Sequence, residues 1–356
     1  MSSVINKLRM ENVTRREKWI DFGRAIAIIA VVLNHAYGRL YTGVVVEYLT
    51  YFNVSLFIYL MGTTQFLSLE RNQGPVWKKM LRSIWKIIVP YVVCSFIYDA
   101  VQNQGFDLIR ILRKVCHFDA SQPLYYVLLY IQLLIISPII YNWVRTRNPV
   151  RMMVGMCVVV AFSVISYKRS VLFEVYGGAK YLFGSTYLIE LYIGMLFATI
   201  YPVMDRYFKT WISRVMVLLL CLSGLFISGM MVAGSGSIFV EMQPSWPTIN
   251  PPGAVLIVYS FFVFLSIFAW TEMAELFAVT SRLTELISRL GGHTLYIFLY
   301  HLLFFECFLP DYGSRVLNWI IDLPVLLGGP IVIEYIFRRS GEMIRSIYAG
   351  IQESEG

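Results

Sequence analysis

The sequence predicts an all-α, polytopic membrane protein with about ten transmembrane helices. Hydrophobic residues make up 58% of the 356-residue chain and charged residues only 15%, whereas a soluble domain averages about 45–50% apolar and about 25% charged residues. The mean hydropathy is +0.64. Apolar stretches also recur at the length of about 20 residues that a bilayer-spanning helix needs.

Ten stretches of the chain fit that length, and they follow one another with short polar interruptions. Turn and charge signals separate several of them, as in R-N-Q-G-P at 71–75 and R-T-R-N-P at 145–149. The predicted spans are 19–38, 46–68, 81–101, 123–143, 151–167, 181–201, 214–234, 252–271, 293–309 and 315–337.

No stretch outside these spans is long enough for a separate soluble domain. The sequence therefore predicts a cytoplasmic N-terminal segment (1–18), a single membrane-embedded domain (19–337) and a cytoplasmic C-terminal tail (338–356). Within the loop 102–122, the stretch F-D-L-I-R-I-L-R-K has a weak apolar stripe and is expected to lie as an interfacial helix.

The distribution of Lys and Arg predicts the orientation. Ten spans place both termini on one side, and roughly 20 of the 30 Lys and Arg residues fall on that side, against about eight on the other. Since cytoplasmic loops carry the excess of positive charge, both termini are expected in the cytoplasm. In a membrane protein, this net charge of +8 indicates contact with anionic lipid head groups, and nothing resembles a nucleic-acid-binding module.

The first span carries a polar stripe of Asp21, Arg24 and His35. The 11 positions from Arg24 to His35 turn a helix about 20° past three full turns, so the two side chains share one face about 16 Å apart. Asp21 lies one turn before Arg24 and can form an ion pair with it. Polar groups at membrane depth indicate a functional site, although Asp21 and Arg24 could also simply lie at the head groups.

Other polar groups fall at membrane depth in later spans. Lys79, Arg82 and Lys86 follow one face of the third span, and such cations suit a polyanion such as a nucleotide phosphate; as an alternative they anchor the inner end of the span. Glu190 in the sixth span must be neutral, paired or facing water. Its partner is either His35 or an arginine, or else it forms a structural hydrogen bond to a neighbouring helix. The ninth span supplies the remaining two candidates, Tyr300 and His301, although a histidine on an aromatic-rich span is more often a satisfied core residue than a catalyst.

The chemistry that these groups support is general-base catalysis beside a bound anion. No H-E-x-x-H is present and the four histidines share no i,i+4 spacing, so no metal site is expected. A serine nucleophile of the G-x-S-x-G type is also absent. A neutral imidazole can accept the proton of a hydroxyl as it attacks a thioester, which contributes about 10²–10⁴ in rate.

The run I-D-F-G-R-A-I-A-I-I-A-V-V-L-N-H resembles the first helix of acyltransferase family 3, in which an Arg or Lys is followed, after ten residues, by a His. Further stretches are similar to later parts of the same family: S-L-F-I-Y-L-M-G at 55–62, K-K-M-L-R-S-I-W-K-I-I-V-P at 78–90, P-L-Y-Y-V-L-L-Y-I-Q-L-L-I-I-S-P at 123–138 and T-L-Y-I-F-L-Y-H at 294–301. Two positions depart from the pattern, since Lys79 replaces the first Arg of R-x-x-R and Met61 replaces a Ser.

The resemblance implies an integral membrane O-acyltransferase of the bacterial cytoplasmic (inner) membrane. It would transfer an acyl group, usually acetyl, from acetyl-CoA or another acyl-CoA as co-substrate to a hydroxyl of a cell-envelope polysaccharide or lipid-linked glycan. His35 would be the catalytic base, and Arg24, Lys79, Arg82 and Lys86 would bind CoA, with Asp21, Glu190, Tyr300 and His301 in support. Some relatives act in poly-N-acetylglucosamine export or transfer succinyl groups.

Two other function classes remain compatible with the residues. The intramembrane polar groups could line the pathway of a polysaccharide exporter or of a sugar or proton transporter. A receptor would keep the cationic face but predicts no turnover. Inverted repeats would favour a transporter, and the sequence contains none that we detect.

Overall fold

The computed structural model describes residues 18–72, 74–103, 107–175, 184–207, 210–233, 252–310 and 312–355. The predicted N-terminal segment 1–18 therefore lies almost entirely outside the described residues. Within the described ranges the ordered elements are helices, and the β-structure is limited to an isolated bridge between Tyr37 and Tyr41. The prediction of an all-α fold is confirmed.

Each predicted span overlaps a helix or two consecutive helices in the described residues. In chain order these are α2 (Lys18–His35), α3 (Val44–Thr50) with α4 (Asn53–Glu70), α5 (Val76–Asn103), η1 (Gln122–Leu124) with α7 (Tyr125–Val144), α8 (Pro149–Val175), η3 (Gly184–Tyr187) with α9 (Leu188–Tyr207), α10 (Trp211–Ala233), α12 (Ala254–Ala274), α14 (Thr294–Cys307) and α15 (Arg315–Glu355).

In the described part of the chain, seven helical segments are long and apolar enough to cross a membrane, and α14 is a shorter apolar helix. α2 is not among the seven because Lys18, Asp21 and Arg24 fall within its 18 residues. The count of ten spans and the cytoplasmic position of both termini stay predictions. α15 continues as one helix through the predicted tail 338–356 as far as Glu355.

The second predicted span is interrupted where the sequence suggested one continuous helix. Thr50 Oγ1 donates to the carbonyl of Glu47 (2.7 Å), and Asn53 Oδ1 accepts from the backbone N–H of Val54 (2.6 Å). Such local bonds between side chain and backbone compete with helical hydrogen bonds. α3 therefore ends at Thr50, and α4 begins at Asn53.

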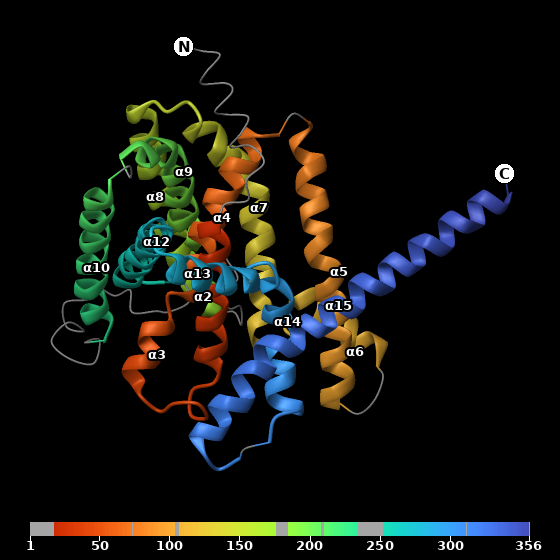
Figure 1. The fold of residues 1–356 in the computed structure, drawn as a ribbon. Coiled ribbons are helices and arrows are strands. Elements are labelled where there is room, and N and C mark those ends of the chain that lie inside the picture. The colour runs from red at the N-terminus through yellow and green to blue at the C-terminus, as the bar shows by residue number, and fades with distance from the viewer. Residues whose placement is uncertain are drawn as a thin grey trace.

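α2 lies in the middle of the bundle, where α4, α12, α13 and α14 pack against it (Figure 1). α13 (Ala278–Leu290) was missed in the sequence, because 13 residues are too few to span a bilayer and the helix carries charges. Gly291, which follows α13, lies against the backbone of Asp21 so closely that a Cβ atom would collide with it. The turn between α13 and α14 thus packs directly on the first turn of α2.

A close helix crossing connects α4 and α9. A Cβ atom on Gly62 would meet the carbonyl oxygen of Leu191, and one on Gly194 would meet that of Tyr59. Thr63 Oγ1 also lies 3.0 Å from the carbonyl oxygen of Gly194. Small residues allow backbones to approach in this way in membrane proteins, and the crossing holds α4 beside α2.

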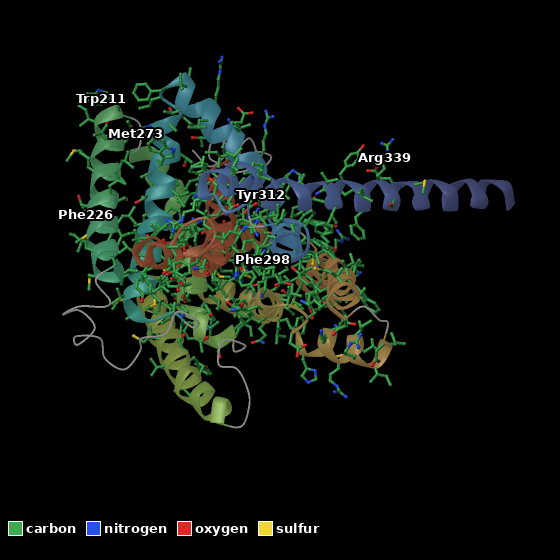
Figure 2. All side chains as sticks on the ribbon, turned by 90° about the horizontal axis from the view of Figure 1, so that it is seen from below. Trp211, Phe226, Met273, Phe298, Tyr312 and Arg339 are labelled. Carbon is green, nitrogen blue, oxygen red and sulfur yellow. The ribbon has the colours of Figure 1, made fainter. Side chains whose placement is uncertain are left out.

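Large apolar side chains cover the outside of the bundle. Phe226 and Leu220 on α10 are about 70% exposed (69% and 71%), and Figure 2 shows Phe226 and Trp211 on the outward side of this helix while Phe298 lies in the interior. A soluble monomer rarely exposes such continuous apolar surface. Together with the seven apolar helices, this surface indicates a multi-pass membrane protein.

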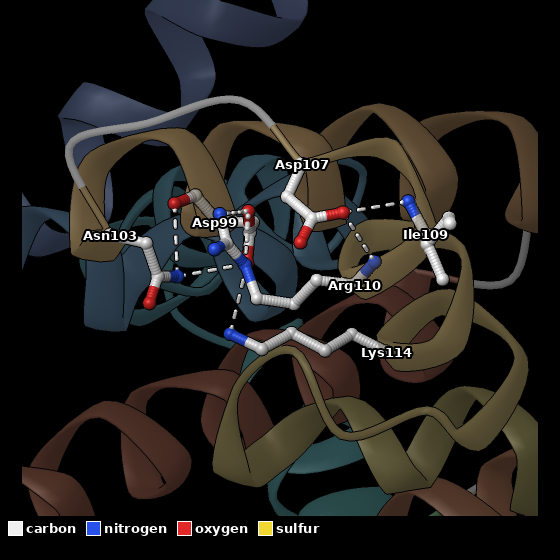
Figure 3. A network of polar contacts seen from close by, with 6 residues as sticks. All are labelled: Asp99, Asn103, Asp107, Ile109, Arg110 and Lys114. Atoms are coloured by element: carbon white, nitrogen blue, oxygen red, sulfur yellow. Dashed lines mark hydrogen bonds and ion pairs between the residues drawn. The ribbon is translucent and has the colours of Figure 1, made fainter.

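The stretch that was expected to lie as an interfacial helix is helical, as α6 (Leu108–His117), and its interfacial position stays a prediction. Asp107 caps it by accepting from the backbone N–H groups of Ile109 and Arg110 (3.0 and 3.1 Å). Its basic face docks on α5, where the fully buried Asp99 accepts from Arg110 (2.8 Å) and Lys114 (3.1 Å) (Figure 3). These contacts raise the pKa of the Arg110 guanidinium.

Replacing Asp99 with Asn is expected to loosen α6 from α5. The amide keeps the shape of the carboxylate but loses its charge, so two cations on α6 lose their counter-charge. Hydrogen exchange of the α6 backbone should increase, while exchange of the buried core helix α4 should not. Asp107→Asn serves as the control, since Asn caps a helix about as well as Asp. Unchanged exchange in α6 of Asp99→Asn would contradict this role.

Candidate functional site

One end of α2 carries the expected ion pair. Arg24 Nη1 lies 3.3 Å from Asp21 Oδ1, one helical turn earlier, and Arg24 Nη2 donates to Thr64 Oγ1 on α4 (3.3 Å). Asp21 is buried, whereas the Arg24 side chain is 30% exposed. The guanidinium is therefore held by two helices and still reaches open space.

That open space is a pocket of about 310 Å³ between α2, α4 and the start of α5. Three basic residues line it against a single carboxylate, so it favours an anion. Lys79 Nζ donates to the backbone carbonyl of Ser68, which fixes the ammonium group at the pocket wall. The complete lining is Ile20, Asp21, Arg24, Thr64, Leu67, Ser68, Arg71 and Lys79.

The four predicted CoA-binding residues separate into two groups. Arg24 and Lys79 line the pocket, although they are 55 positions apart in the sequence. Arg82 and Lys86 lie on an exposed side of α5 and are not part of the lining. The structure thus brings two of the four cations together at one place.

His35 is the last residue of α2, about 16 Å along the helix from Arg24. It is partly exposed. The ring of His301 on α14 lies beside it, with 5.2 Å between the ring centroids and 44° between the ring planes. The structure therefore brings together the two histidines that the sequence proposed from separate spans.

His301 is almost completely buried, at 1% exposure, and its Nδ1 lies 2.9 Å from the carbonyl oxygen of Phe298 and 3.0 Å from that of Ile297. Its Nε2 is buried and has no hydrogen-bond partner within the described ranges. The neighbouring Tyr300 is fully buried and stacks on Tyr296, with 6.2 Å between the ring centroids.

Glu190 is fully buried on α9, and its contact is with neither histidine. Ser55 Oγ on α4 donates to Glu190 Oε1 (3.3 Å), while Oε2 has no hydrogen-bond partner in the described part of the chain. Of the two alternatives for Glu190, the structure shows the hydrogen bond to a neighbouring helix, at the contact of α4 and α9, and not a contact with His35 or an arginine within the described residues.

The sequence reasoning missed three polar residues that line the pocket. Thr64 and Ser68 are one turn apart on α4, and Arg71 follows directly after that helix. Helical spacing places all three along one side, so this pattern could have been found in the sequence. The sequence did not show that this side of α4 faces α2, because the two helices meet only in the folded bundle.

A second missed feature is the anchor of the chain just after His35. Arg39 forms a two-point contact with Asp322 on α15, with Nε to Oδ2 at 2.6 Å and Nη2 to Oδ1 at 3.1 Å. It also donates to the carbonyls of Leu309 (2.9 Å) and Pro310 (2.7 Å). Asp322 is fully buried. Arg39 therefore ties the end of α2 to the connection between α14 and α15.

The family model described as an acyltransferase domain matches residues 17–339 of the chain. This range includes the pocket, both histidines, Arg39 and Asp322. A search of curated proteins and a search of solved structures found no match.

Proposed function

The chain belongs to this acyltransferase family, and from this premise we propose that it transfers an acyl group, most simply acetyl, from acyl-CoA on the cytoplasmic side of a bacterial inner membrane. The acceptor is a hydroxyl of a cell-envelope polysaccharide or lipid-linked glycan. The observation that carries the proposal is the arrangement along α2, with a cationic pocket at one end and an accessible histidine at the other.

The pocket suits the phosphate groups of CoA. Arg24 and Lys79 provide charge-assisted donors, and Thr64 adds a hydroxyl beside the guanidinium. The distance of about 16 Å to His35 is one that the extended pantetheine arm of CoA can cover. CoA held by its phosphates would thus present its thioester near the histidine pair.

His35 acts as the general base. Its imidazole accepts the proton of the acceptor hydroxyl while the oxygen attacks the thioester carbonyl carbon. The C–O bond forms, the C–S bond breaks, and the imidazolium returns the proton to the leaving thiolate. Partial exposure of His35 supports this role, since the base must reach the acceptor.

The test is acetyl-CoA consumption by the purified, detergent-solubilised protein, followed as release of free thiol with and without crude envelope glycan. Thiol release that requires the glycan would support acyl transfer to a carbohydrate. Release without glycan would indicate hydrolysis, and no release together with no CoA binding would favour a transporter or a receptor.

Lys79→Ala is expected to raise KM for acetyl-CoA roughly 10- to 100-fold and to change kcat little. A hydrogen bond to a charged group contributes about 1.5–3 kcal/mol, and about 1.4 kcal/mol corresponds to a tenfold change. Steady-state thiol release measures both constants. Lys78→Ala is the matched control, because Lys78 is adjacent, exposed and outside the pocket.

If Lys78→Ala and Lys79→Ala raise KM equally, the pocket is not the CoA site. Arg82→Ala measures whether the bound molecule also reaches the exposed side of α5. An increase in KM for Arg82→Ala would extend the site beyond the pocket, as the sequence predicted.

A further inference from the structure

The hydrogen bonds of His301 fix which of its ring nitrogens carries a hydrogen. Nδ1 lies within 3.0 Å of two backbone carbonyl oxygens, those of Ile297 and Phe298. A carbonyl oxygen only accepts hydrogen bonds, so Nδ1 must be the N–H nitrogen. Since a buried charge without a partner is costly, the ring is neutral. Its Nε2 is therefore the nitrogen with the lone pair.

This lone pair has no donor in the described parts of the chain. Nε2 is buried and has no hydrogen-bond partner, although most buried polar atoms in proteins have one. The neighbouring polar group is the ring of His35, whose centroid lies 5.2 Å away. At this centroid separation, an N–H of His35 that points along the line between the rings is close enough to donate to His301 Nε2. Hydrogen bonds between catalytic groups are often long before substrate binds.

We propose that His301 is a positioning residue that sets the tautomer of His35. Its Nε2 accepts the N–H hydrogen of His35, and the opposite nitrogen of His35 then carries the lone pair that receives the proton of the acceptor. This proposal rests on the proposed acyl transfer. The backbone carbonyls of α14 thus fix the tautomer of His301, and His301 in turn fixes the tautomer of His35.

The role resembles that of the aspartate in a serine-protease triad, which holds a histidine in the correct tautomer. Here a neutral imidazole takes the place of the carboxylate, so no permanent charge is buried next to the base. When His35 becomes an imidazolium, its bond to Nε2 becomes charge-assisted and stronger. His301 neither gains nor loses a proton in the complete reaction.

Two substitutions separate this role from simple packing. Asn at position 301 places its amide where Nδ1 lies and can still donate to the two carbonyls, but it leaves no acceptor at the place of Nε2. Gln has the longer side chain and can present its carbonyl oxygen near Nε2, facing His35. His301→Asn therefore keeps the donor to the carbonyls without the acceptor for His35, and His301→Gln supplies that acceptor.

His301→Asn is expected to lower kcat about 10- to 100-fold without raising KM for acetyl-CoA. His301→Gln is expected to recover activity to within a few-fold of the wild type. Thermal unfolding of both variants in detergent checks that they are folded. If His301→Asn keeps the wild-type kcat, or if Gln is the more damaging substitution, the proposal is wrong and His301 only satisfies the carbonyls of its own helix.

A second readout does not depend on turnover. With ¹⁵N-labelled histidine, only four residues are labelled, and ring ¹⁵N shifts report which nitrogen of His35 carries the hydrogen. The wild type should show one tautomer and His301→Asn a mixture. Equal tautomer populations in both proteins would overturn the proposal. If the tautomer of His35 changes as expected but the protein transfers no acyl group, the role of His301 is supported and the proposed function is wrong.

Discussion

His35→Ala is expected to lower kcat for acyl transfer by about 10²–10⁴-fold, the contribution of a general base. The methyl group of alanine cannot accept the hydroxyl proton, so the attacking oxygen would have to carry that proton into the transition state. KM for acetyl-CoA should change little, because the pocket with Arg24 and Lys79 lies about 16 Å away along the helix.

The measurement is thiol release with saturating glycan, together with a stability check by thermal unfolding. His117→Ala is a matched control, since His117 is exposed at the end of α6 and its Nδ1 lies 2.8 Å from the carbonyl oxygen of Arg113 on the same helix. The control should retain wild-type kcat. Product formation at the wild-type rate by folded His35→Ala would remove this residue as the base.

Arg39→Ala is expected to destabilise the protein by about 3–5 kcal/mol, the range for removing one partner of a buried ion pair. Asp322 is fully buried and would be left without its counter-charge, and the carbonyls of Leu309 and Pro310 would lose donors. Arg39 is four residues from His35, so folded Arg39→Ala should also have a lower kcat.

Denaturation in detergent measures this effect, with Arg315→Ala as the control for an exposed arginine at the start of α15. The double variant Arg39→Ala, Asp322→Ala should lose less stability than the sum of the two single variants, because it leaves no unpaired charge. Additive losses would show that the two side chains are not coupled.

Local sequence patterns were sufficient for most of the helices. The apolar windows found the ten predicted spans in order, because a helix in lipid satisfies its backbone hydrogen bonds internally and exposes apolar side chains. The ion pair of Asp21 with Arg24 and the helix α6 also followed from spacing within a few residues. The break before Asn53 was missed although the hydrogen bonds that accompany it, those of Thr50 and Asn53, are local. The helix α13 was missed because it has only 13 residues and carries charges, so it does not fit a membrane-spanning window.

In the candidate site, too, relations within one helix were predictable from the sequence and contacts between helices were not. The sequence by itself determined that Arg24 and His35 share one face of one helix, because helical geometry fixes residues on a single segment. Only the tertiary structure decided that Lys79 joins Arg24 in a pocket, that His301 rather than Glu190 lies beside His35, and that Asp322 anchors Arg39. Those pairs come from different helices, and their contact depends on how the helices pack, for which the spacing along the chain contains no information.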